Sequence, residues 1–581
     1  MTDQQHGDQK PLRNPGDNPG DNPGADPGLD PEYMDQAMKG LSGGPGGPVS
    51  MKHPKGLWVL FITEMWERFS YYGMRAILAL YLAHTAVQMD AGRSGVGFGW
   101  DQADASVLYG IYTFMVYVTS IFGGMAADRF LGTHRSMLFG GSIIAVGHIC
   151  LAFTELFKAA DGTIVTPETA SSTIGVFLLG LTFIIIGTGF FKPCVSVMVG
   201  QLYRENDPRR DSGFTIFYMG INLGAALSPL VAGTLAQRVG WHWGFGSAAV
   251  GMIIGLVTYS VMRSRYLRGI GDAPERSWDG TAWLKFGCII AGLVAIPLVP
   301  MLLYLTGNLD PITNAWTSIT GTLGVYGTAA AIAGLILAAC VGFLMMQMPE
   351  HRSRIAVIFI LAILGNIFFW VAFEQAGTSM NFFATDSTDL TIYGLWEAGM
   401  PSTWYQSVNA FTIVLCAPIF SWLWIWLARR RKDPSTPMKF AIGLWLLGLS
   451  FIAMVFGAMD ARDGLAGPHW LFITYVVYTW GELCLSPVGL SMVTKLAPKH
   501  LQSLLMGIWF MSLALSNLIA GLVAAFAEKF DPASTAAEEL QTFIIPGQAG
   551  FYLMLVVFPV GSGLVIALLT PLMKKMMRGI H

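Results

Sequence analysis

Long apolar runs, separated by short polar segments, recur along the chain after its first fifty residues. Their approximate bounds are residues 55–84, 103–127, 136–157, 172–200, 212–236, 243–263, 283–305, 322–347, 355–376, 403–429, 438–458, 470–496, 500–526 and 549–574. A run of about 20 residues is long enough to cross a hydrocarbon core of ~30 Å as a helix. The pattern therefore predicts fourteen membrane-spanning helices, with two sets of six on either side of an inserted pair.

This pattern divides the chain into four segments. Residues 1–50 are so rich in Asn, Pro, Gly and Asp that they cannot build a core, and we expect a disordered cytoplasmic tail. Residues 51–268 hold the first six helices, residues 269–350 a linker with two extra helices, and residues 351–581 the second six. The predicted fold is an all-α polytopic membrane protein made of two six-helix bundles and an inserted two-helix hairpin.

Loop charges predict the orientation of the chain. The Lys and Arg residues of the loops favour one side of the predicted spans over the other by about four to one, and the side alternates with every span. Positive residues gather on the cytoplasmic side of membrane proteins. We therefore expect a multi-pass monomer in the lipid of the plasma (inner) membrane, with both termini in the cytoplasm.

Composition excludes most other classes of protein. Of 581 residues, 53% are hydrophobic and only 12% are charged, against about 25% charged in soluble domains. The net charge of −2 and the lack of a basic cluster in the sequence give no support to nucleic-acid binding. Six cysteines stand alone within apolar runs, which is typical of packing residues rather than metal ligands or disulfides. The sequence contains no nucleophile elbow, phosphate loop or metal-spaced His and Cys set, so we predict neither an enzyme nor a cofactor.

The first predicted helix carries an unusual set of charges within its apolar run. These residues are Glu64, Glu67, Arg68 and Arg75. Each Asp, Lys or Arg in such a position costs roughly +2.5 to +3.5 kcal/mol on insertion scales, unless it faces water or an opposite charge. At about 100° per residue, all four share one half of the helix with Tyr71, which indicates a functional site. The alternative is a structural ion pair, since Glu64 and Arg68 stand four residues apart.

Further charges and amides interrupt later spans. They are Lys192, Asn222, Glu374, Asn409 and Glu482. A rise of 1.5 Å per residue places Arg75 and Glu374 in the outer half of the membrane, and Lys192 and Glu482 near its middle. We therefore expect two exchangeable gate pairs between the bundles, Arg75 with Glu374 and Lys192 with Glu482. By contrast, we interpret His148 as a hydrogen-bonded core residue rather than as a proton relay.

Several segments together resemble the proton-dependent oligopeptide transporters, a branch of the major facilitator superfamily. The first of them is similar to the family signature E-x-x-E-R-F-x-Y-Y. The matching segments, in family order, are residues 64–72, 123–132, 189–193, 217–224, 373–375 and 481–487. The likeness runs from about residue 54 to residue 575, and the inserted pair looks like the helical hairpin of bacterial members.

The resemblance implies symport of di- and tripeptides with protons, by alternating access between the two bundles. It implies that Glu64, Glu67 and Arg68 couple protonation to peptide binding. Arg68 and Lys192 would receive the peptide carboxylate, and Glu482 its ammonium. Further substrate contacts would come from Tyr71, Tyr72, Tyr112, Asn222, Asn409 and Trp509. The same residues make chemical sense, because a zwitterionic peptide needs a cation at one end of its site and a carboxylate at the other.

One departure from the family affects the proton site. Animal members place a histidine on helix two, whereas residues 109–112 contain none. Proton binding must then rest on the carboxylates of the first helix. Two other functions stay open, namely transport of another small solute, such as nitrate or another anion, and a receptor that uses the fold without transport.

Overall fold

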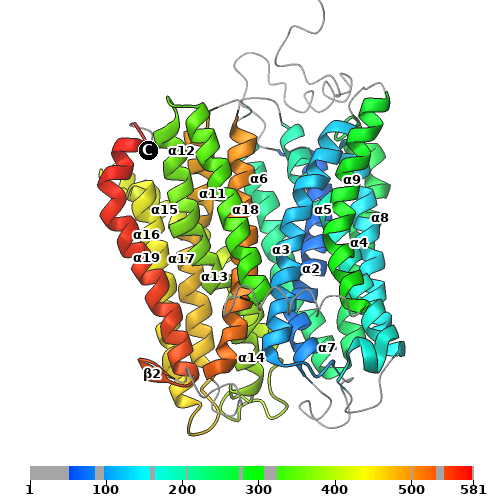
Figure 1. Cartoon of the computed structure of the whole chain (residues 1–581), viewed down its shortest axis with the longest axis vertical. Helices are drawn as coiled ribbons and strands as arrows, with labels where there is room; N and C mark the ends of the chain where they lie inside the picture. The colour runs from blue at the N-terminus through cyan, green and yellow to red at the C-terminus, as the bar shows by residue number, and fades with distance from the viewer. Residues whose placement is uncertain are drawn as a thin grey trace, which may run out of the picture.

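The computed structural model describes residues 52–84, 97–157, 164–203, 207, 209–273, 279–306, 324–498, 501–530 and 542–578. The predicted tail, residues 1–50, lies outside this part of the chain. Within it, helices stand side by side in two halves, and one short antiparallel pair joins β1 (Thr542–Phe543) to β2 (Ile545–Pro546) (Figure 1).

The first half is built around α2 (Lys55–Ala83), which packs against α6 and α8. Its other helices are α3 (Gln102–Ala126), α4 (Gly132–Phe153), α5 (Pro167–Gln201), α6 (Arg210–Ser228), α7 (Thr234–Arg238) and α8 (Trp241–Tyr266). A π-helical turn, Pro229–Gly233, joins α6 to α7, so that the two form one membrane-length segment.

The second half begins with a segmented helix. Its parts are α12 (Arg352–Ile360), a π-helical turn (Leu361–Ile367), α13 (Phe368–Phe373), a 3₁₀ turn (Glu374–Gly377) and α14 (Ser379–Asp386). The helices that follow are α15 (Tyr405–Arg429), α16 (Thr436–Asp460), α17 (His469–Leu496), α18 (Gln502–Phe526) and α19 (Gln548–Met576).

Two inserted helices lie between the halves in sequence. The first, α9 (Gly280–Leu305), packs on α3 and α5, while α11 (Gly324–Gln347) packs on α18 and α12 (Figure 1). Each inserted helix therefore belongs in space to a different half of the molecule.

Eleven helical segments of the described residues are long and apolar enough to cross a membrane, and one of these, Gln102–Leu156, runs through both α3 and α4. The helix α2 is not among the eleven, since its centre is interrupted by charged residues. The predicted all-helical, polytopic membrane protein is confirmed. The count of fourteen spans stays a prediction.

The predicted end of the span at residues 355–376 is wrong, because the helical segment runs on to Asp386. Several polar residues after Gly377 are buried within this continuation, and two of them donate hydrogen bonds. Asn381 donates to the carbonyl of Ala76 at 2.9 Å, and Ser379 donates to Gln375 Oε1 at 2.7 Å. These bonds satisfy polar groups that would otherwise oppose burial.

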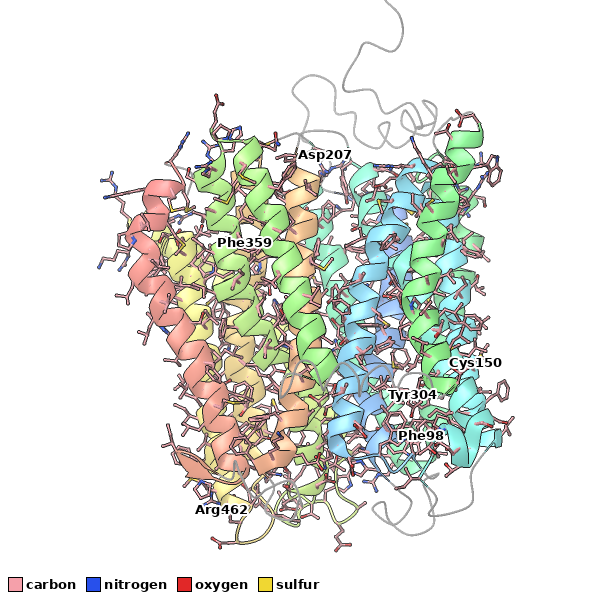
Figure 2. All side chains as sticks on the ribbon, in the orientation of Figure 1. Phe98, Cys150, Asp207, Tyr304, Phe359 and Arg462 are labelled. Atoms are coloured by element: carbon pink, nitrogen blue, oxygen red, sulfur yellow. The ribbon has the colours of Figure 1, made fainter. Side chains whose placement is uncertain are left out.

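The two ends of the molecule differ in charge and in contacts. We call the end that carries the C-terminus and the exposed residues 429–432 the basic end, and the opposite end the far end (Figure 1). Figure 2 shows Asp207 near the basic end and Phe98 and Arg462 near the far end. At the far end, Trp404 Nε1 donates to Thr234 Oγ1 at 2.8 Å across the two halves.

Other polar contacts also join the halves at the far end. Gln237 Nε2 donates to Ser402 Oγ at 2.7 Å, and Arg238 donates to the carbonyl of Ala398 at 2.6 Å. His84 Nε2 lies 2.9 Å from Asp386 Oδ1. The far end of the molecule is therefore closed in this structure.

The loop that supplies part of this closure, residues 387–401, is held by its own hydrogen bonds. The Asp389 carboxylate accepts from the Thr391 hydroxyl at 2.5 Å and from the Tyr393 amide at 2.9 Å. These donors, that of Thr391 above all, hold the pKa of Asp389 below its usual value. The loop is thus fixed while the carboxylate is ionised.

Candidate functional site

A cavity of about 270 Å³ lies between the two halves. Its wall combines tyrosines, amides and charged groups from α2, α3 and α6 with residues of α13, α15 and α17. The lining residues used below are Tyr72, Arg75, Tyr109, Tyr117, Tyr218, Asn222, Trp370, Phe373, Glu374, Asn409, Tyr478 and Glu482. Polar and charged side chains are costly within a membrane and usually mark a functional site. Because so many of them converge on this cavity, it is the candidate functional site.

The charges of α2 form a buried cluster beside the cavity. Arg68 Nε donates to Glu64 Oε1 at 2.8 Å, as expected for residues four apart on a helix. Glu67 Oε2 lies 2.8 Å from the same nitrogen, but this buried oxygen has no directed hydrogen bond within the described residues. Glu64 is thus the better satisfied of the two carboxylates. None of the three residues is in the cavity wall itself.

Arg75 joins the two halves at the side of the cavity toward the far end. Its guanidinium forms a buried ion pair with the Glu374 carboxylate, and its Nε donates to the Tyr109 hydroxyl at 2.8 Å. The guanidinium also lies 5.3 Å from the ring centre of Tyr109. The structure therefore brings Arg75 and Glu374 together, on α2 and the 3₁₀ turn after α13.

Lys192 and Glu482 are apart. The Lys192 ammonium lies 3.4 Å from the centre of the Tyr117 ring, and no ion pair links it to Glu482 in the described part of the chain. Glu482 Oε2 instead accepts a hydrogen bond of 2.9 Å from Asn409, whose amide also donates to Thr479 Oγ1 at 2.9 Å. Of the two expected pairs, Arg75 with Glu374 is thus in contact, and Lys192 with Glu482 is not.

The remaining residues expected to contact substrate separate into two groups. Tyr72, Asn222 and Asn409 line the cavity, and Asn222 donates to the carbonyl of Tyr218 at 2.9 Å. A second group lies behind the wall and consists of Tyr71, Tyr112 and Trp509, all of them buried. Within that group, Trp509 packs edge-to-face on Phe440, with ring centres 6.0 Å apart.

Several residues of the cavity wall were not predicted as site residues from the sequence. They include Tyr109, Tyr117, Trp370, Phe373 and Tyr478. Helical spacing could have indicated two of them, because Trp370 stands four residues before Glu374, and Tyr478 four before Glu482. The tyrosines of α3 carried no such signal, since no charged residue of that helix marks the wall.

His148 lies within the first half and away from the cavity. Its Nε2 shares a hydrogen bond of 2.6 Å with Ser70 Oγ, and the histidine is fully buried. This contact supports its interpretation as a core residue.

Two bundles of membrane-length helices that enclose a shared charged cavity define a membrane transporter. The chain belongs to the POT family, whose PTR2 model matches residues 134–540. The family consists of transporters, so the prediction that the protein is not an enzyme is confirmed.

Known proteins similar to this chain support the assignment. The peptide transporter YePEPT of Yersinia enterocolitica is 37% identical over 496 residues, which cover 82% of this chain and 89% of that protein. An uncharacterized transporter of Bacillus subtilis, YclF, is 37% identical over 532 residues, covering 91% and 96%.

Solved structures show the same fold. The crystal structure of the peptide transporter POT in complex with sulfate has a TM-score of 0.73 and 33% identity, covering 94% of this chain and 99% of that chain. A POT family transporter in complex with 5-aminolevulinic acid has a TM-score of 0.73 and 32% identity, covering 90% and 97%. The predicted major facilitator architecture is therefore confirmed.

Proposed function

We propose that this protein imports di- and tripeptides together with protons, by alternating access across the inner membrane, as a monomer with both termini in the cytoplasm. The peptide-transporting relatives support the substrate class. The observation that carries the proposal is a pair of opposite charges on different halves, Lys192 and Glu482, neither ion-paired in the described part of the chain.

These two groups suit the two ends of a peptide. The Lys192 ammonium, with Arg68 nearby on α2, would receive the carboxylate, and Glu482 would receive the ammonium. Asn222 and Asn409 in the wall would hydrogen-bond the peptide backbone. A peptide that bridges the halves in this way draws them together, which is the occlusion that alternating access requires.

The cluster on α2 supplies the proposed proton coupling. Arg68 is shared between Glu64 and Glu67, and Glu67 has the weaker hydrogen bonding. When a peptide carboxylate draws Arg68 away, a buried negative charge is left without its partner, and a proton then neutralises it. The ion pair of Arg75 with Glu374 would be the matching far-end gate, closed in this structure and open when substrate enters.

The variant Glu67→Gln tests the coupling. We expect it to lose accumulation driven by an inward acid gradient, because its side chain cannot take up the proton. Counterflow of labelled against unlabelled peptide needs no net proton movement and should remain. Acid-driven accumulation that persists in Glu67→Gln would refute the role of Glu67.

The matched control for this variant is Glu397→Gln, which changes an exposed glutamate of the far-end loop. It should keep both activities. Competition by unlabelled dialanine separates peptide transport from transport of nitrate or another small anion, because only a peptide site is blocked by dialanine.

A further inference from the structure

An aromatic strip lines the part of the cavity that belongs to the second half. Trp370 and Phe373 of α13 meet edge-to-face with ring centres 4.8 Å apart, and Phe373 meets Tyr478 of α17 in the same way at 4.5 Å. All three residues belong to the cavity wall. Their faces are uncharged, so the strip suits an uncharged or aromatic side chain of a bound peptide.

A buried amide fixes the indole of Trp370. Its Nε1 donates to Asn366 Oδ1 at 2.9 Å, and Asn366 is only 2% exposed. Asn366 belongs to the π-helical turn Leu361–Ile367. Such turns interrupt the regular helix and often occur at functional sites. Here the turn lies one helical turn before the wall residue whose indole the amide holds.

The amide is fixed in turn by α18. Asn366 Nδ2 donates to Ser512 Oγ at 2.8 Å, and the Ser512 hydroxyl donates to the carbonyl of Trp509 at 2.7 Å. The indole can only donate, so the amide must present its oxygen to Trp370 and its nitrogen to Ser512. In all three hydrogen bonds the donor lies on the side of the cavity wall, and the last acceptor is the backbone of α18.

We infer that Asn366 is a positioning residue that sets which peptide side chains the cavity accepts, by holding the Trp370 indole against α18. The inference rests on the proposed peptide transport. A buried network that served folding alone would affect all peptides alike. An indole released from Asn366 would instead change the fit of large side chains and leave small ones almost untouched, because only a large side chain reaches the strip.

The test compares inhibition of labelled peptide uptake by Ala-Ala, Phe-Ala and Ala-Phe. Asn366→Leu removes both hydrogen bonds at similar size. We expect it to raise the inhibitory concentration of the better phenylalanine peptide by about fivefold relative to that of Ala-Ala. Trp370→Phe keeps a ring but loses the indole N–H, and it should shift the same ratio in the same direction.

Ser450→Ala is the matched control, because Ser450 is a buried serine of α16 whose hydroxyl, among the described residues, donates to its own helix alone, at the carbonyl of Leu447. It should leave the ratio unchanged. If Asn366→Leu does not fold, Ser512→Ala decides, since it removes only the partner of Asn366 and should shift the ratio by about twofold.

A ratio equal to that of the wild-type protein, in a variant that still takes up peptide, overturns the inference alone. If none of the three peptides inhibits uptake by the wild-type protein, the proposed function is overturned, and the inference with it.

Discussion

Lys192 is the residue whose surroundings say most about how the site could work. Its ammonium lies on the face of Tyr117 rather than against a carboxylate. A cation on an aromatic ring gains about 0.5 to 2 kcal/mol, less than a well-formed buried ion pair. Lys192 can therefore leave Tyr117 for a stronger anionic partner, which in the proposed cycle is a peptide carboxylate or Glu482.

Removing this cation should weaken peptide binding. We expect Lys192→Gln to raise the peptide concentration for half-maximal counterflow by roughly tenfold or more, because a charge-assisted contact is lost. Lys285→Gln, which changes an exposed lysine on α9, should have no effect. An unchanged half-maximal concentration in Lys192→Gln would contradict the proposed carboxylate contact.

At the scale of the elements, α3 of the first half and α18 of the second half approach each other closely. A Cβ atom on Gly521 would lie 2.6 Å from the carbonyl oxygen of Ser106 and 2.8 Å from the Cα of Gly110. The two backbones thus touch because both positions lack a side chain. In this structure, with its far end closed, the contact is formed.

Filling the contact should hold the halves apart. We expect Gly521→Val to lower peptide uptake at least severalfold, with a cost of about 1 to 3 kcal/mol from overpacking in the closed state. Gly507→Ala, on the same helix but facing open space, should transport normally. Normal uptake by Gly521→Val would show that close packing of α3 and α18 is not needed for transport.

The elements also show what the sequence could predict. Helices such as α9 and α16 lie where their apolar runs place them, because a membrane-length run is a strong local signal. The continuation to α14 was missed, since Asn381, one of its buried polar residues, donates to the backbone of α2, far away in sequence. The π-helical turn that contains Asn366 was also missed. Its contact with α18, through the hydrogen bond from Asn366 to Ser512, again joins residues far apart in sequence.

The residues of the candidate site also divide into those that the sequence could predict and those that it could not. Charged residues within apolar runs, such as Glu374 and Glu482, stand out in the sequence because each is costly in a membrane. Aromatic wall residues, such as Tyr117 and Trp370, do not stand out, because tyrosine and tryptophan are ordinary in membrane helices. Only the spatial meeting of the halves distinguishes these aromatic residues from packing residues.

At the scale of the whole molecule, the two halves are joined at the far end by contacts that must break if substrate is to enter there. Gln237 with Ser402 and Trp404 with Thr234 are such contacts. Short polar bonds of this kind contribute only about 0.5 to 1.5 kcal/mol each, so together they can hold one state without trapping it.

A cross-link across the far end should therefore stop transport. With the native cysteines replaced, we expect a short bismaleimide to join Gln237→Cys to Ser402→Cys and to abolish uptake. The control joins Thr385→Cys to Ser402→Cys, two positions in contact within the second half, and should leave uptake intact. Full activity after cross-linking of Gln237→Cys to Ser402→Cys would exclude opening at the far end.

Peptide uptake into liposomes, measured with and without an inward-directed acid gradient, tests proton-driven peptide import most directly. We expect labelled dialanine to accumulate inside above its external concentration when the gradient is present, and only to equilibrate when it is absent. Equal accumulation under both conditions, or no uptake of dialanine at all, would contradict proton-coupled peptide transport by this protein.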